Sequence, residues 1–197
     1  MILRKIQSFC FIFVTFLIGY YPVASAQNLP GDVNKVDDFS LKDYNGKDYS
    51  LSDFKDSKAI VIIFVATECP VSNAYNSRME SIYNDYKNKN VTMVGINSNK
   101  AEDIGRIKEH AKSKGLTFPI LKDEKNIIAD KFRASVTPEV FVLNNNFEVL
   151  YHGRIDDSRD ESDVEKKDLR YALDEILSDK QVSDPVTKAF GCTIKRI

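Results

Sequence analysis

Residues 59–72 read AIVIIFVATECPVS, and this stretch decides the fold. Its first part, Ala59 to Val65, is an unbroken run of β-branched, aromatic and small apolar residues, which is typical of a strand buried on both faces. From Asn73 to Lys87, apolar side chains recur at helical spacing. A helix therefore follows the strand after only a few residues, and Cys69 lies in the strand-to-helix turn.

The segments on either side continue this alternation. We expect a second strand over Val91 to Ile96 and a helix over Ala101 to Lys114, with Ile104 and Ile107 facing inward and Gly115 ending it. The remaining expected elements are a hairpin around the 43–47 turn, a short apolar run at 118–121, a short helix over 124–132, a hairpin of strands 140–143 and 147–151, and a closing helix over 164–177. Residues 178–197 show no convincing period. Parallel strands with crossover helices, finished by a hairpin and a helix, predict an α/β sandwich.

The first residues predict export. Two basic residues precede an apolar run over 9–23, and Ala24-Ser25-Ala26 has the form of a cleavage site. We interpret residues 1–26 as a signal peptide, with an uncleaved membrane anchor as the alternative. In both cases the folded part lies outside the cytoplasm, in the periplasm or the extracellular space. We expect one domain over 27–197, with a core over about 33–180 and a tail over 181–197 that carries Cys192.

Charge does not point to a polyanionic partner. The chain has 28 Lys and Arg against 29 Asp and Glu, and these residues alternate in segments such as 108–114. Nothing here argues for nucleic acid or for binding of the mature domain to an anionic membrane. The expected partner is a thiol or disulfide substrate, either a protein or a small molecule. The oligomeric state is left open.

The turn at Cys69 is suited to thiol chemistry. A thiol at a helix N-terminus faces unpaired backbone N–H groups and the positive end of the helix dipole, and both favour the nucleophilic thiolate. Pro70 suits the first helical turn, and the Ser72 hydroxyl is positioned to donate a hydrogen bond to the sulfur. Cys69-Pro70-Val71-Ser72 is therefore a candidate activated cysteine.

Two motifs together resemble the thioredoxin superfamily. The strand that runs into Cys69-Pro70 is one of them, and Val136-Thr137-Pro138 before a later strand is the other. Within the superfamily the chain is most similar to the redoxin or peroxiredoxin-like (AhpC/TSA-related) branch, over roughly residues 33 to 197; further matching segments are 137–142, 151–157 and 191–194. The resemblance implies a thioredoxin-like fold, with a mixed central sheet flanked by helices, and a cis peptide bond at Pro138 beside the active-site sulfur.

The chain also departs from that family. A thioredoxin has a second cysteine where this chain has Ser72, which excludes simple CxxC dithiol cycling. A peroxiredoxin is expected to have a threonine at the position of Ala66, and Thr67 is one place off register. Cys192 is a possible substitute for the missing partner, as a resolving thiol. The alternatives are a static bridge from Cys69 to Cys192, or no bridge.

Other candidate residues have more ordinary interpretations. His110 lies in a charged helix and is expected to be solvent-exposed, while His152 ends a strand away from the site. Arg154 is expected to fix the turn after the hairpin. The acidic stretch 156–163 lacks the glycine of a calcium loop and has Lys167 where the bidentate glutamate should be. No local zinc signature is present either.

Three functions fit these residues. The first is an extracytoplasmic thiol-disulfide oxidoreductase in which Cys69 attacks, Ser72 stabilises its thiolate, Pro138 shapes the substrate groove and Cys192 resolves. The second is a thiol peroxidase with the same nucleophile. The third is a redox-silent binding or copper-handling module, because soft thiolates favour Cu(I). None of them requires an organic cofactor.

Overall fold

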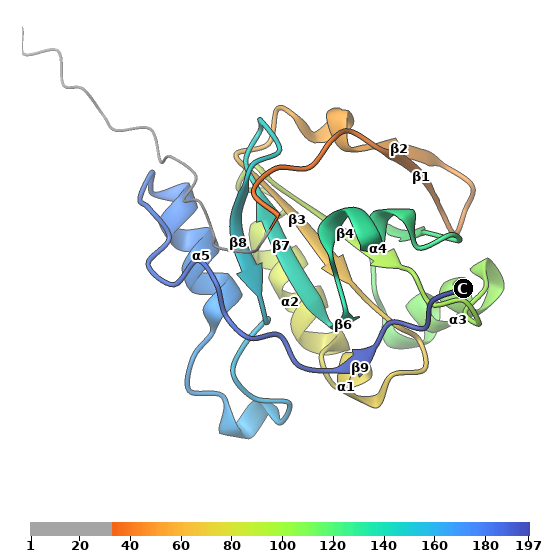
Figure 1. The fold of residues 1–197 in the computed structure, drawn as a ribbon. Coiled ribbons are helices and arrows are strands. Elements are labelled where there is room, and N and C mark those ends of the chain that lie inside the picture. Colours follow the sequence, from red (N-terminus) through yellow and green to blue (C-terminus); the bar gives the residue numbers. More distant parts are fainter. Residues whose placement is uncertain (1–32) are drawn as a thin grey trace, which may run out of the picture.

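The computed structural model describes residues 33–197, which form an α/β structure around a seven-stranded mixed sheet (Figure 1). The sheet order is β2-β1-β5-β4-β3-β7-β8. Its strands are β1 (Ser40–Asp43), β2 (Asp48–Ser50), β3 (Ala59–Phe64), β4 (Val91–Asn97), β5 (Ile120–Lys122), β7 (Glu139–Leu143) and β8 (Val149–Gly153). The predicted signal peptide over 1–26 lies outside the described residues.

The central strand is the one predicted from its composition. All six residues of β3 are buried, and the strand pairs in parallel with β4 and antiparallel with β7. Its side chains alternate between two core clusters: Val61 and Ile63 belong to one, Ile62 and Phe64 to the other. Burial on both faces explains why this strand lacks the alternation of polar and apolar residues seen at sheet surfaces.

Helices cover both faces of the sheet. The helices are α1 (Pro70–Ala74), α2 (Asn76–Tyr86), α3 (Ile104–Lys114), α4 (Ile127–Phe132) and α5 (Asp168–Leu177). Residues of α2, α3 and α5 pack in one core cluster, and residues of α4 pack in the other. This arrangement of helices around a mixed sheet confirms the predicted fold class.

Some predicted boundaries and one predicted orientation are wrong. The helix expected over 101–114 begins at Ile104, because the Asp103 side chain caps it by accepting a hydrogen bond from the Arg106 amide. Ile104 therefore lies in the first turn, and it is 39% exposed instead of facing inward. Ile107 is buried, and Gly115 ends the helix with a φ of +66°, as predicted.

Both predicted hairpins are present. β1 and β2 pair antiparallel around the 43–47 turn, where the Asp43 carboxylate accepts hydrogen bonds from the Asn45 and Lys47 amides. β7 and β8 pair antiparallel after the predicted Asn144–Asn146 turn. The closing helix α5 begins at Asp168, later than expected, and non-helical residues 164–167 connect it to a preceding 3-10 turn, η2 (Glu161–Asp163).

The C-terminal tail, in contrast to its lack of sequence period, has a defined position. It crosses the molecule beside α1 and includes β9 (Cys192–Thr193), which pairs antiparallel with β6 (Val136–Thr137) in a separate two-stranded sheet (Figure 1). Ile194 is 3% exposed and packs in the second core cluster. The strand has only two residues and is followed by one buried side chain, so the segment is too short to show a periodic pattern in the sequence.

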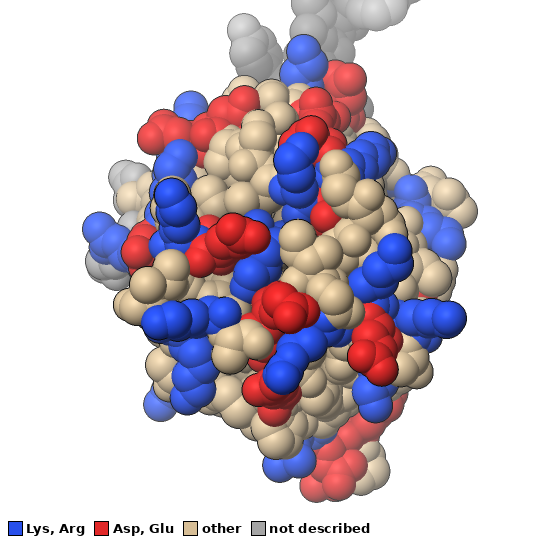
Figure 2. Space-filling view, turned by 90° about the vertical axis from the view of Figure 1, so that its right-hand side faces the viewer, with Lys and Arg blue, Asp and Glu red and all other residues tan. Residues whose placement is uncertain are grey.

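The surface near the C-terminus carries charges of both signs. Figure 2 shows Lys and Arg side chains interspersed with Asp and Glu over this face, without a large patch of one sign. Within residues 33–197, no helix combines the length and the apolar character needed to cross a membrane.

Candidate active site

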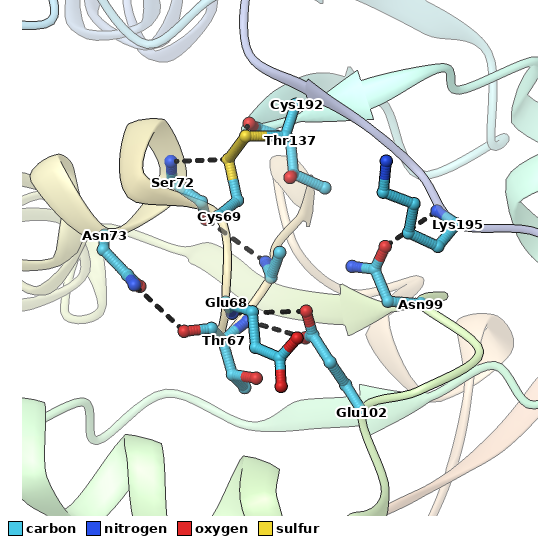
Figure 3. Close-up of a disulfide and its surroundings, with 11 residues drawn as sticks. Thr67, Glu68, Cys69, Ser72, Asn73, Asn99, Glu102, Thr137, Cys192 and Lys195 are labelled. Carbon is cyan, nitrogen blue, oxygen red and sulfur yellow. Dashed lines mark hydrogen bonds between the residues drawn. A yellow bond between two sulfur atoms is a disulfide. The ribbon is translucent and has the colours of Figure 1, made fainter.

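Cys69 lies in the turn between β3 and α1, directly before the first residue of α1. It is the N-cap residue of α1, with extended backbone angles, and Pro70 occupies the first helical position. The Ser72 amide donates a hydrogen bond to the Cys69 Sγ over 3.3 Å (Figure 3). The sulfur is therefore held against the electropositive start of the helix, as the sequence predicted.

The role of Ser72 differs in detail from the prediction. Its backbone N–H, instead of its hydroxyl, makes the contact with the sulfur. The hydroxyl oxygen accepts a hydrogen bond from the Ala66 amide at 3.2 Å, and the side chain is fully buried. Ser72 thereby ties the end of β3 to the first turn of α1, which fixes the approach of the chain to Cys69.

A disulfide joins Cys69 to Cys192. The two Cα atoms are 5.8 Å apart, although the residues are separated by 123 positions in the sequence. Pairing of β9 with β6 places Cys192 opposite Thr137, where its sulfur meets that of Cys69 (Figure 3). Of the three alternatives drawn from the sequence, the one without a bridge is wrong, because the bridge is formed.

The strand before Pro138 forms the other wall of the site. The Thr137–Pro138 peptide bond is cis, as the family resemblance implied. The Thr137 carbonyl oxygen lies 3.4 Å from the Cys69 Sγ. Cys69 itself is only 5% exposed, because α1, β6 and the tail surround it. The structure thus brings all four predicted site residues, Cys69, Ser72, Pro138 and Cys192, into one place.

A buried glutamate that the sequence did not single out supports the loop before Cys69. Glu102 is 4% exposed, and its carboxylate accepts hydrogen bonds from the Thr67 amide (2.6 Å) and the Glu68 amide (3.2 Å) (Figure 3). It also accepts a hydrogen bond from the Asn97 side chain (2.5 Å). The loop is thereby fastened to the end of β4. In the sequence, Glu102 precedes a helix cap and looks like an ordinary surface acid, so no local signal marks it.

A second buried glutamate supports the other wall. Glu139 accepts hydrogen bonds from the amides of Ser135 and Val136 and from the His152 ring over 2.7 Å. Burial by itself would raise the pKa of Glu139, but the hydrogen bonds from His152 and the two amides outweigh it and lower this pKa. His152 therefore reaches the site only indirectly, through the residue that follows Pro138.

The remaining candidates serve the scaffold. His110 is half-buried, and its ring Nε2 lies 3.3 Å from the side-chain nitrogen Nδ2 of Asn76. The expectation of a solvent-exposed histidine is therefore wrong. Burial, together with the charge of Lys114, lowers the pKa of His110. Arg154 donates to Asp168 at 2.8 Å and fixes the chain after β8 to α5, which is the predicted kind of role.

Two further observations bear on peroxide and metal chemistry. At the position where a peroxiredoxin has its threonine, Ala66 offers only backbone groups, and its N–H is bonded to Ser72. Thr67, one position further on, lines a small pocket together with Asn76 and His110. Among residues 33–197, no group of three or more His, Cys, Asp or Glu side chains is arranged to hold a metal ion.

Comparison with known proteins places this geometry in a family. The chain is 32% identical to a hypothetical protein from Sinorhizobium meliloti 1021 of known crystal structure, with a TM-score of 0.80 over 86% of this chain and 97% of that one. It is 29% identical to the thiol-disulfide oxidoreductase ResA of Geobacillus kaustophilus over 57% of this chain and 63% of that protein, so the match spans less than two thirds of this relative. It is 30% identical to the chloroplastic peroxiredoxin Q of Gentiana triflora over 55% of this chain and 52% of that protein.

These similarities agree with the fold and with the two-motif site. The family model described as the AhpC/TSA family matches residues 33–157, which include Cys69 and Pro138 but not Cys192. The match extends over more than half of the sequence. The chain therefore belongs to the AhpC/TSA family and has the thioredoxin-like fold.

Proposed function

We propose that this protein is an exported thiol-disulfide oxidoreductase that uses Cys69 as its nucleophile and Cys192 as its resolving thiol. The observation that carries the proposal is the Cys69–Cys192 bridge, formed at a helix N-terminus and beside the strand that precedes Pro138. Two cysteines so far apart in the sequence meet where the backbone amide of Ser72 favours a thiolate.

The reaction needs no group beyond the two thiols and the substrate. The Cys69 thiolate attacks a substrate disulfide, the substrate S–S bond breaks, and the departing thiolate takes up a proton. The Cys192 thiolate then attacks the Cys69 sulfur and releases the second substrate sulfur. Two electrons pass from the protein to the substrate, and an external thiol or dithiol reductant opens the bridge again. The same steps in the reverse order oxidise a dithiol substrate.

In this proposal each site residue has a part in these steps. Ser72 and the start of α1 stabilise the thiolate, Glu102 holds the loop before Cys69, and Pro138 shapes the wall against which the substrate lies. The relatives named thiol-disulfide oxidoreductase support this assignment. Export to the periplasm or the extracellular space remains part of the proposal, based on residues 1–26, and is tested by the mass of the protein recovered outside the cytoplasm.

The first test is equilibration of the mature protein in thiol buffers, with mass spectrometry to identify the bridged cysteines. A bridge that opens reversibly well above about −300 mV supports catalysis, whereas a more negative potential favours a static bridge. In a second test, the reduced protein is mixed with a small aromatic disulfide, and the products are identified by mass spectrometry. The Cys192→Ala variant should accumulate a mixed disulfide between Cys69 and the reagent. The Cys69→Ala variant should form no such adduct at position 69. The wild-type protein should end with the Cys69–Cys192 disulfide.

The same samples test the alternatives. Rapid sulfenate formation on Cys69 with hydroperoxide, faster than its reaction with disulfides, would replace the proposal with a thiol peroxidase. Full function of Cys69→Ala in the cell would point to the redox-silent or copper-handling module. The lack of a side-chain hydroxyl at position 66 is our reason for ranking disulfide exchange above peroxide reduction.

A further inference from the structure

The strand β6 would have an open edge beside Cys69 if the tail were absent. In the described part of the chain, β6 pairs with β9 and with no other strand. The register sets Val136 opposite Thr193 and Thr137 opposite Cys192, and the Ile194 amide donates to the Ser135 carbonyl oxygen over 2.9 Å. These are backbone contacts, which any extended peptide can make with a strand edge.

The residue before Cys192 must be very small. A Cβ atom added to Gly191 would overlap sterically with the Thr137 carbonyl oxygen and would lie only 2.6 Å from the carbonyl carbon. The obstacle is backbone, so a side chain cannot be accommodated by a rotamer change. A peptide that places its cysteine against Cys69 in this register therefore needs glycine immediately before the cysteine.

The tail is also held by contacts that do not depend on the disulfide. Ile194 is buried in the core, the Lys195 amide donates to the Asn99 side chain at 2.8 Å, and the Lys100 amide donates to the Lys195 carbonyl oxygen at 2.8 Å. On the other side of Cys192, the Phe190 ring packs edge-on against Tyr75. The tail thus occupies the β6 edge through backbone, core and ring contacts as well as through the disulfide.

We propose that the β6 edge is the docking surface for an extended glycine-cysteine segment of a partner protein, and that residues 190–195 are an intramolecular stand-in for that segment. The inference rests on the proposed function and adds the class of substrate. A partner strand whose cysteine is part of a disulfide displaces the tail. The Cys69 thiolate attacks that cysteine, the partner S–S bond breaks, and its other sulfur leaves as a thiolate, which gives the mixed disulfide with Cys69. When the Cys192 thiolate attacks Cys69, the partner sulfur leaves as a thiolate and the tail returns to β6. A small disulfide has no backbone to pair with β6 and gains nothing from this edge.

The test uses two peptides with the sequence of residues 189–196, AFGCTIKR and AFACTIKR, each activated as a mixed disulfide with 5-thio-2-nitrobenzoate. The Cys192→Ser variant of the mature chain (residues 27–197), reduced beforehand, has Cys69 as its only cysteine and cannot resolve the product. Attack by the Cys69 thiolate forms the Cys69–peptide disulfide and releases the coloured thiolate, so the rate is read directly. The proposal expects at least about tenfold faster reaction with the glycine peptide, which corresponds to about 1.4 kcal/mol.

A second variant tests displacement of the tail. Adding Gly191→Ala to Cys192→Ser should weaken tail docking and accelerate the glycine peptide at least severalfold, while the reaction with a small aromatic disulfide changes little. Gly105→Ala is the matched control, because Gly105 is exposed on α3 and an added Cβ meets only the end of the Asp103 side chain. Hydrogen exchange limited to the tail would show that the rest of the domain remains folded.

The outcomes separate this inference from the proposed function. Equal rates for the two peptides, with normal reaction of the small disulfide, would refute the docking surface and leave Cys69 as a nucleophile for small molecules. No reaction of Cys69 with either peptide or with the small disulfide would refute both. The peptide comparison does not depend on the Gly191 variant, so it remains decisive if that variant fails to fold.

Discussion

Replacing Cys192 with serine should cost the folded protein about 5 kcal/mol of unfolding free energy. The bridge closes a loop of 123 residues, and the chain-entropy relation for a loop of that length gives about 5 kcal/mol at 25 °C. The substitution leaves Cys69 in place, and the tail keeps its contacts at Ile194 and Lys195. The loss therefore arises mainly in the unfolded chain, which the bridge no longer restricts.

The assay is urea unfolding of the oxidised wild type and of Cys192→Ser, with Thr193→Ala as the control for a change in the same strand. Thr193 is exposed and pairs with Val136 through its backbone, so Thr193→Ala should change stability by less than about 1 kcal/mol. The slope against urea should rise in Cys192→Ser, because the unbridged unfolded chain exposes more surface.

The same quantity has a redox consequence. If the bridge stabilises the folded state by about 5 kcal/mol, a thermodynamic cycle requires that folding lowers the reduction potential of the cysteine pair by about 100 mV relative to the unfolded chain. A loss of less than about 2 kcal/mol in Cys192→Ser, with an unchanged urea slope, would refute this reasoning. It would mean that the unfolded chain is already compact around the two cysteines.

Three further predictions concern buried charged groups. Glu102→Gln should cost about 1–3 kcal/mol in urea unfolding, because one of the three donors around the carboxylate loses its acceptor, whereas Glu109→Gln on the exposed face of α3 should have little effect. Equal effects of the two would contradict a supporting role. Because the pKa of Glu139 in the folded protein lies below its ordinary value of 4.5, its contribution to stability is present above that value and is lost as the pH falls through the lowered one. Glu139→Gln should therefore flatten the loss of stability below about pH 4.5 in unfolding curves measured at a series of pH values; an unchanged profile would assign the acid sensitivity to other groups. Arg78→Met should cost about 3–5 kcal/mol in thermal or urea unfolding, because it leaves the buried Asp156 carboxylate without its ion-pair partner at 2.7 Å. A loss below about 1 kcal/mol would contradict this role of the Arg78–Asp156 ion pair.

The sequence by itself determined the central part of the fold. The apolar run at 59–65 correctly predicted a strand buried on both faces, and the helical spacing after it placed Cys69 in a strand-to-helix turn. Gly115 marked the end of α3, and the Asn144–Asn146 turn marked the connection between β7 and β8, both through local backbone preferences. These features are encoded within about a dozen neighbouring residues, which is the range over which periodicity and turn chemistry operate.

Only the tertiary structure decided how the site is completed. The strand pair β6–β9 joins two-residue segments from distant parts of the chain, and such short strands have no period. Glu102 and Glu139 are charged residues whose burial depends on backbone amides supplied by other loops. The orientation of Ile104 was missed because the Asp103 cap shifted the start of the helix. The sequence therefore pointed to Cys69 as the candidate nucleophile from local chemistry, whereas its pairing with Cys192 and the burial of the two carboxylates depend on contacts between segments that only folding brings together.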